Sequence, residues 1–281
     1  MIVDFHSHIF PDKIAEKAVQ TMQQNTGFPI NMIPTESSLT ESMKKSTEKD
    51  GKGIDLSILL PVCTNPEKCW NLNEFARGIN EKYASTPADS KEPRLLSFGA
   101  IHPAMGDLRN AIYRIKEMGF KGIKLHPDNQ NTFFDDENYI KIIQYAEEND
   151  LITVVHSGYD GTDFHEIRCT PFRILNVLKR IQPKKLIMAH MGANYMWYDV
   201  EQTICGKGLY FDTAFVNKRI STEQMMRLIE KNGPEKILFG SDSPWDDQSE
   251  DMDFIKNLPL SEGDQKLILG DNAVKLLGLK I

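Results

Sequence analysis

The sequence predicts an α/β protein that folds as a single (β/α)8 TIM barrel over residues 1–281, with an insertion after the first strand. The chain length matches the usual size of one closed barrel. Eight short apolar runs alternate with segments of helical periodicity. Such alternation requires parallel strands, because each helix returns the chain to the same end of the sheet. Eight of these units indicate closure into a barrel.

The eight predicted strands are runs of aliphatic and β-branched residues that are too short to be helices. In chain order they are Ile2 to Phe5, Ile54 to Leu60, Leu95 to Ile101, Lys121 to Leu125, Leu151 to Val155, Leu186 to Ala189, Leu209 to Phe211 and Ile237 to Phe239.

Helical patterns fill the intervals between these strands. Leu108, Ala111, Ile112, Ile115 and Met118 share one helical face, and residues 138–149 are again helical. Thr170 and Pro171 supply an N-cap followed by proline in the first turn. Ser221 and Gln224 form a capping box, and the stretch from Asp264 to Leu277 is helical.

Residues 11–50 interrupt the regular alternation directly after the first strand. They contain a helical segment, a polar loop and a charged helical stretch. This insertion is either a lid over the barrel mouth or a surface excursion, and the sequence does not distinguish the two.

The composition excludes several classes of protein. A net charge of −7, from 40 acidic and 33 basic residues, gives no basic surface for nucleic acid. No apolar run approaches the roughly 18 residues of a membrane span. The four cysteines have no closely paired spacing, which predicts reduced thiols. We therefore expect a cytoplasmic protein with no membrane partner. The sequence does not determine the oligomeric state and is compatible with a homodimer.

Six of the seven histidines fall at or just past the C-terminal end of a predicted strand. They are His6, His8, His102, His126, His156 and His190, and Asp212 and Asp242 end two further strands in the same way. Barrel enzymes build their active sites at this face, from residues on several strands. Core packing would not concentrate imidazoles there, so the pattern predicts an active site.

The first strand carries Asp4, His6 and His8 at alternate positions, which project to the same side of a regular strand. Two neutral imidazoles at this spacing can bind one divalent cation, with Asp4 supporting them. The pair alone is a weak motif. Histidines on strands five and six and an aspartate on strand eight make it strong.

Several motifs together resemble the amidohydrolase superfamily. They are Asp4-Phe-His-Ser-His8, Lys124-Leu-His-Pro127, His156-Ser-Gly158, His190-Met-Gly192, Gly240-Ser-Asp-Ser-Pro244 and Gly270-Asp-Asn-Ala-Val-Lys-Leu-Leu277. Within that superfamily the chain is most similar to the amidohydrolase-related branch, which contains aminocarboxymuconate-semialdehyde decarboxylase and resorcylate decarboxylase. The resemblance spans nearly the whole chain.

The resemblance implies that His6, His8, His156 and Asp242 coordinate one divalent metal, with zinc favoured over other ions. Asp242 would take a proton from a metal-activated water, and His190 would hydrogen-bond the water or the polarised oxygen. The simpler alternative for Asp242 is a helix N-cap.

Lys124 has three open interpretations. In two-metal members of the superfamily a carbamylated lysine bridges the ions, and His190 then binds the second metal. Lys124 can instead anchor a substrate carboxylate or phosphate, or form a structural ion pair. Further expected substrate-binding residues are His126, Arg168 and Trp245.

The favoured function is hydrolysis of a small amide, ester or lactone by a metal-activated water. The alternative is metal-dependent, non-oxidative decarboxylation of a small aromatic or unsaturated acid. A second alternative is a metal-binding protein without catalysis. The expected partner is a small molecule that can bear a carboxylate.

Overall fold

The computed structural model describes residues 1–46, 53–87, 90, 92–161 and 166–279. All strand pairs in this part of the chain are parallel, and they form two sheets. One has the order β1 (Val3–Ser7), β2 (Leu56–Leu59), β3 (Arg94–Ser97). The other has the order β4 (Gly99–Ala100), β5 (Gly122–Leu125), β6 (Ile152–Val155), β7 (Leu186–Met188), β8 (Tyr210–Asp212), β9 (Ile237–Leu238).

The two sheets join at both seams, so the predicted (β/α)8 barrel is confirmed. At one seam, β3 and β4 are the two halves of the predicted third strand and are separated only by Phe98. At the other, the Phe5 amide donates to the Phe239 carbonyl at 2.8 Å, and the His8 amide donates to the Ser243 carbonyl at 2.7 Å. These bonds attach the first strand to the chain that follows the last.

The third strand divides because side chains from a helix bind its backbone. The amide of Asn80 bonds both the Ser97 nitrogen, at 2.6 Å, and the Ser97 carbonyl, at 2.9 Å. Asn73 bonds the nitrogen and carbonyl of Ala100 in the same way, at 2.7 and 2.9 Å. Both asparagines belong to the helix that follows β2, so they link that helix to the barrel wall.

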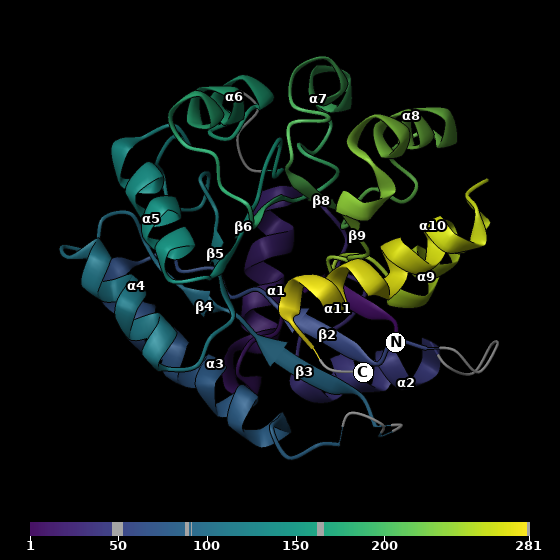
Figure 1. Cartoon of the computed structure of the whole chain (residues 1–281). Helices are drawn as coiled ribbons and strands as arrows, with labels where there is room; N and C mark the ends of the chain where they lie inside the picture. Colours follow the sequence, from purple (N-terminus) through teal and green to yellow (C-terminus); the bar gives the residue numbers. More distant parts are fainter. Residues whose placement is uncertain (47–52, 88–89, 91, 162–165, 280–281) are drawn as a thin grey trace.

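Helices surround the ring of strands (Figure 1). In chain order they are α3 (Cys69–Tyr83), α4 (Leu108–Glu117), α5 (Glu137–Glu148), α6 (Pro171–Arg180), α7 (Trp197–Thr203), α8 (Thr222–Asn232), α9 (Gln248–Asn257) and α10 (Glu262–Lys266). Short helical turns η1 (Pro66–Lys68), η2 (Pro234–Lys236) and η3 (Leu267–Asp271) precede α3, β9 and α11 (Asn272–Leu277). The predicted caps on α6 and α8 are present, with Thr170 accepting from the Arg173 amide and Ser221 from the Gln224 amide.

Two helices close the ends of the barrel (Figure 1). At one end, Val274 and Leu277 of α11 join the interior cluster that contains Phe5 and Phe98. At the other end lies α1 (Asp12–Thr26), the first helix of the predicted insertion. The insertion also contains α2 (Glu36–Ser46), which contacts α9, while its residues 47–50 lie outside the described part of the chain.

The prediction of four reduced thiols is wrong for two of them. Cys63 and Cys69 form a disulfide with their Cα atoms 5.5 Å apart, whereas Cys169 and Cys205 are free. The chain turns back through η1 between the two cysteines, and this turn brings together thiols that are six positions apart. Within the described residues no helix has the length and hydrophobicity needed to cross a membrane. The cytoplasmic location stays a prediction.

Candidate metal centre

The C-terminal ends of four strands bring five of the predicted site residues into one cluster. The Asp242 Oδ1 atom lies 3.1 Å from His8 Nε2 and 3.4 Å from His6 Nε2. On the neighbouring strand ends, His156 Nδ1 lies 2.9 Å from His190 Nε2. His6, His190 and Asp242 offer ligand atoms that all lie within 4.8 Å of one another. The predicted convergence of these side chains is therefore present in the fold.

Hydrogen bonds fix which nitrogen of each ring faces the cluster. Each Nδ1 meets an oxygen acceptor: His6 meets Asp212 at 2.8 Å, His8 meets the Leu60 carbonyl at 2.9 Å, and His190 meets the Ala214 carbonyl at 2.9 Å. A neutral imidazole that donates through Nδ1 carries its lone pair on Nε2. All three rings therefore direct a lone pair towards the cluster, as metal ligands do.

The electrostatics of the cluster favour a divalent cation. Burial lowers the pKa of His6, His156 and His190, so these rings are neutral near pH 7. Burial raises the pKa of Asp242, but the neighbouring His6 and other imidazoles lower it by more, so the carboxylate is ionised. The Nε2 atoms of His8 and His6 lie 3.1 and 3.4 Å from Asp242 Oδ1. Atoms that each carry a lone pair repel one another at these distances unless a cation lies between them. Tetrahedral ligands about 2.0–2.1 Å from zinc are separated by roughly 3.3 Å, so the donor set fits such an ion.

His156 has a buried nitrogen that makes no hydrogen bond to any residue that the structure describes. His190 Nε2 carries a lone pair, so His156 Nδ1 donates to it, and His156 Nε2 has no partner among those residues. The ring of His126 stacks on that of His156, with centroids 4.1 Å apart and planes within 4°. These two rings and Asp160 lie close enough to suggest a second cation. However, parallel rings direct their lone pairs along parallel lines, so they cannot converge on one ion.

Lys124 lies inside the cluster, with its side chain buried. Its Nζ atom is 3.1 Å from His6 Nε2. Burial lowers the pKa of this ammonium to about 8, against the opposing effect of Asp212 and Asp242. A Lys124 N–H and a bound cation would compete for the same lone pair of His6. The bridging, substrate-anchoring and ion-pair interpretations of Lys124 all stay predictions.

Strained backbone coincides with the site. His190, Phe215 and Asp242 have φ values of 59°, 59° and 62°, a left-handed conformation that non-glycine residues rarely adopt. Each such residue costs about 1–3 kcal/mol, which the surrounding contacts must offset. For Asp242 one of these contacts is the hydrogen bond from its amide to the His6 carbonyl, at 2.8 Å. In this backbone conformation the Asp242 carboxylate points towards the imidazoles of His6 and His8. Asp242 is not a helix cap, because Asp247 caps α9.

Asp4 supports the site by a route that the alternating pattern did not predict. The register of β1 against β2 shifts between Asp4 and Ser7, so the strand is irregular there. The Asp4 carboxylate instead accepts hydrogen bonds from Ser7 Oγ, Ser241 and Gln248, at 2.7 to 2.9 Å. It therefore holds the turn that precedes Asp242, rather than an imidazole.

Asp212, rather than Asp4, orients the imidazole ring of His6. The sequence showed only that Asp212 ends a strand. It accepts from His6 Nδ1 and, through Oδ1, from the His190 amide at 2.9 Å. We expect Asp212→Asn to weaken metal affinity by about 10- to 100-fold, the usual cost of losing a partner of a ligand. Competition with a chromophoric chelator measures this affinity. Unchanged affinity would remove Asp212 from the orienting role.

A cavity of about 770 Å³ opens above the cluster. Lys124, His126 and Trp245 line it together with Phe215, and their roles in substrate binding stay predictions. The structure does not bring Arg168 to this wall: its guanidinium binds Glu166 Oε2 at 2.6 Å and Asn131 Oδ1 at 2.7 Å. Helix α1 forms one side of the cavity through a face that includes Ile14, Lys17, Ala18, Thr21, Met22 and Asn25. The loop after β2 and the start of α3 form another.

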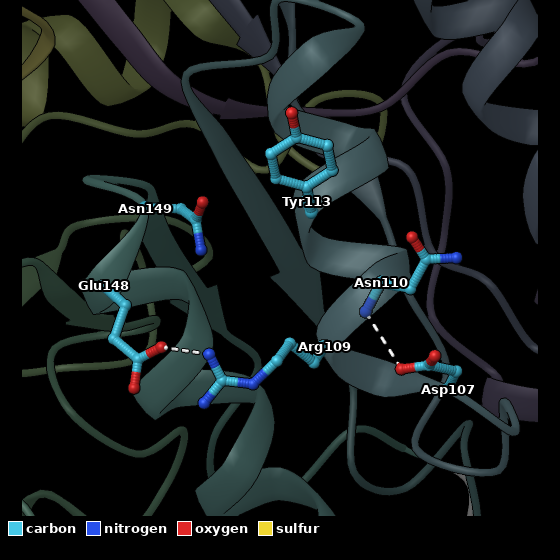
Figure 2. Close-up of a pocket in the computed structure, with 6 residues that line it drawn as sticks. All are labelled: Asp107, Arg109, Asn110, Tyr113, Glu148 and Asn149. Carbon is cyan, nitrogen blue, oxygen red and sulfur yellow. Dashed lines mark hydrogen bonds and ion pairs between the residues drawn. The ribbon is translucent and has the colours of Figure 1, made fainter.

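A second hollow lies between α4 and α5, away from the cluster (Figure 2). Arg109 crosses it to pair with Glu148 at 2.9 Å, and Asp107 caps α4 through the Asn110 amide. Tyr113 is 55% exposed beside them. Every charged group there has a partner or faces water, so this hollow is an ordinary surface.

Comparison with known proteins gives one family and many similar folds. A family model described as Amidohydrolase matches residues 61–279. No curated protein sequence matches the chain. Among solved structures, 5-carboxyvanillate decarboxylase from Sphingomonas paucimobilis is 14% identical, with a TM-score of 0.68 and 99% of each chain covered.

Two further solved structures have the same architecture. The 2,6-dihydroxybenzoate decarboxylase from Rhizobium is 17% identical, with a TM-score of 0.65 over 99% of this chain and 98% of the other. A dihydroxybenzoic acid decarboxylase from a Polaromonas species, solved with manganese and the inhibitor 2-nitroresorcinol, is 16% identical, with a TM-score of 0.66 over 99% and 97%. At these identities the likeness establishes the fold.

Proposed function

The chain belongs to the amidohydrolase family, and we propose that it is a metal-dependent, non-oxidative decarboxylase of a small aromatic acid. The observation that carries the metal-dependent part of this proposal is the donor set of imidazoles and an ionised carboxylate at the floor of a largely apolar cavity. The decarboxylase activities stated for similar structures support it over the hydrolysis that the sequence favoured. One ligand set serves both reactions, so the ligands alone could not distinguish them.

We assign His6, His8, His156 and Asp242 as the residues that hold one divalent cation, for which the His156 ring would turn so that Nε2, rather than the Nδ1–H that now meets His190, faces the other donors. The donors are imidazole nitrogens and a carboxylate oxygen, which suit either zinc or manganese. When bound, such a cation would supply the positive charge that orients the substrate carboxylate. His6 is held by Asp212 and His8 by the Leu60 carbonyl, so the protein keeps these two rings in position before the cation arrives.

Asp242 moves the proton in the proposed reaction. Its carboxylate receives a proton from the substrate or from water and passes it to the ring carbon that bears the carboxylate. The bond between that carbon and the carboxylate then breaks, its electron pair stays with the ring, and carbon dioxide leaves. The Ala214 carbonyl fixes the His190 proton on Nδ1, so His190 Nε2 would accept a hydrogen bond from a hydroxyl group of the substrate in place of the one from His156.

The apolar wall has a physical role in this chemistry. Phe215 and Trp245, with Ile14 and Met22 of α1, border the space above the cluster. A carboxylate loses hydration when it enters such a space, whereas neutral carbon dioxide loses little. We therefore propose that the insertion at residues 11–50 acts as a lid over the barrel mouth, with α1 as the element that excludes water.

Carbon dioxide release tests the proposal directly. The metal-loaded protein is incubated with a panel of hydroxybenzoates in deuterated water, and carbon dioxide and the ring product are measured. We expect carbon dioxide together with one deuterium at the vacated ring carbon, with activity lost on chelation and restored by manganese or zinc. A parallel panel of esters, lactones and amides is the matched comparison. Cleavage there without carbon dioxide would return the assignment to hydrolysis, and inertness in both panels would favour a non-catalytic metal-binding protein.

A further inference from the structure

Two exposed lysines lie in the wall of the cavity that opens above the metal cluster. Lys17 on α1 and Lys68 on η1 both line the space, and both are exposed to solvent. The floor residues Lys124 and Asp242, by contrast, are buried. One cavity is therefore lined both by the buried cluster and by two solvent-exposed ammonium groups.

Helical periodicity directs both lysines into the cavity. On α1 the lining positions are Ile14, Lys17, Ala18, Thr21, Met22 and Asn25, which recur every three or four residues and so share one face. On η1 and α3 they are Lys68, Asn71, Leu72 and Phe75, with the same spacing. Each lysine therefore belongs to a lining face of its helix, next to apolar neighbours.

Neither ammonium has an ion-pair partner within the part of the chain that the structure describes. Other exposed lysines do: Lys44 pairs with Glu92 at 2.7 Å, and Lys82 with Glu36 at 2.6 Å. Within that part of the chain, the acidic residues of the cavity wall are Asp160 and Asp242. The two ammonium groups are therefore available to pair with an anionic ligand, although the protein as a whole has a net charge of −7.

The backbone that carries Lys68 is held firmly. The Lys68 amide donates to the Asn65 carbonyl at 3.0 Å, and Asn65 Oδ1 caps the same turn at 2.9 Å. The disulfide between Cys63 and Cys69 encloses the turn. The buried side chain of Gln130 binds the Cys63 carbonyl at 2.9 Å and the Ile101 carbonyl at 2.7 Å. The position of Lys68 relative to the barrel is therefore fixed before a ligand enters.

We propose that Lys17 and Lys68 form a second anion subsite, so that the substrate is a diacid with an aromatic body. One carboxylate reacts at the cluster, the ring lies between the apolar walls, and the second carboxylate pairs with the two lysines. A cavity of about 770 Å³ falls in the range of roughly 300–1,000 Å³ that accommodates ligands larger than a single-ring monoacid. This inference rests on the proposed function, whose substrate class it narrows.

Binding measured by calorimetry on the metal-loaded protein tests the subsite without turnover. The probes are isophthalate, terephthalate and biphenyl dicarboxylate. Each is compared with the acid of equal size in which a neutral acetyl group replaces one carboxylate. We expect at least one diacid to bind about fivefold to tenfold more tightly than its acetyl analogue, and this preference should shrink as salt screens the lysines.

The double variant Lys17→Gln/Lys68→Gln should abolish the preference for a diacid over its acetyl analogue. Binding of the acetyl analogues themselves should change less than about twofold. The control variant Lys13→Gln/Lys179→Gln removes two exposed lysines outside the cavity wall and should keep the preference. A preference that survives the first variant, or no preference for any diacid, overturns the subsite. A lysine-dependent preference without carbon dioxide release would overturn the proposed function and leave the subsite standing.

Discussion

Substitution of Asp242 by Asn is expected to lower turnover by about 100- to 10,000-fold, the usual contribution of a positioned acid or base. The amide has nearly the shape of the carboxylate, but it can neither accept the proton nor deliver it to the ring carbon. It is also a poorer ligand, so some metal should be lost. Carbon dioxide release per bound metal ion, rather than per chain, separates the two effects.

Asp12→Asn is the control for this change, because it removes the same charge from an exposed position in the first turn of α1. Its turnover should stay within about twofold of the unaltered protein. Thermal unfolding of Asp242→Asn shows whether the barrel persists. Full activity in a folded, metal-loaded Asp242→Asn protein would remove Asp242 from the proton-transfer role.

Replacement of His6 or His8 by Ala is expected to weaken metal binding by more than about 100-fold, since each change removes a direct ligand rather than a supporting group. The loss should be larger for His6, whose ring also contacts Asp212 and Lys124. Elemental analysis after gel filtration gives the metal content. Chelator competition gives the affinity.

His102→Ala is the matched control for the ligand variants. His102 is also a buried histidine just past a strand end, but its Nδ1 accepts from the Ala104 amide, and it lies outside both the cluster and the cavity wall. This variant should keep its metal. Normal metal content in both His6→Ala and His8→Ala would contradict the assigned centre.

Much of the fold could be predicted because its signals are local. Apolar runs alternating with helical stripes specify strands and helices within a few residues of where they occur. The division of the third strand at Phe98 could not be predicted in this way. It depends on Asn73 and Asn80 of α3 reaching the backbone of Ser97 and Ala100, which are 17 to 27 positions away.

The residue types of the site were likewise evident, because metal ligands fall at strand ends and strand ends can be predicted. Their partners were not. Asp212 meets His6 across 206 positions, and the ring of His126 stacks on that of His156. Arg168 had a sequence position that suited substrate binding, yet Glu166 and Asn131 hold it elsewhere.

The sequence by itself determined the barrel, the family and the set of imidazoles and carboxylates at one rim. Only the tertiary structure decided that Asp4 braces the turn before Asp242, that Cys63 bonds Cys69, and that α1 borders the cavity. The physical reason is the distance along the chain over which each interaction acts. Periodicity and capping act over a few residues, whereas these contacts depend on the irregular register of β1 and on chain closure over turns and loops.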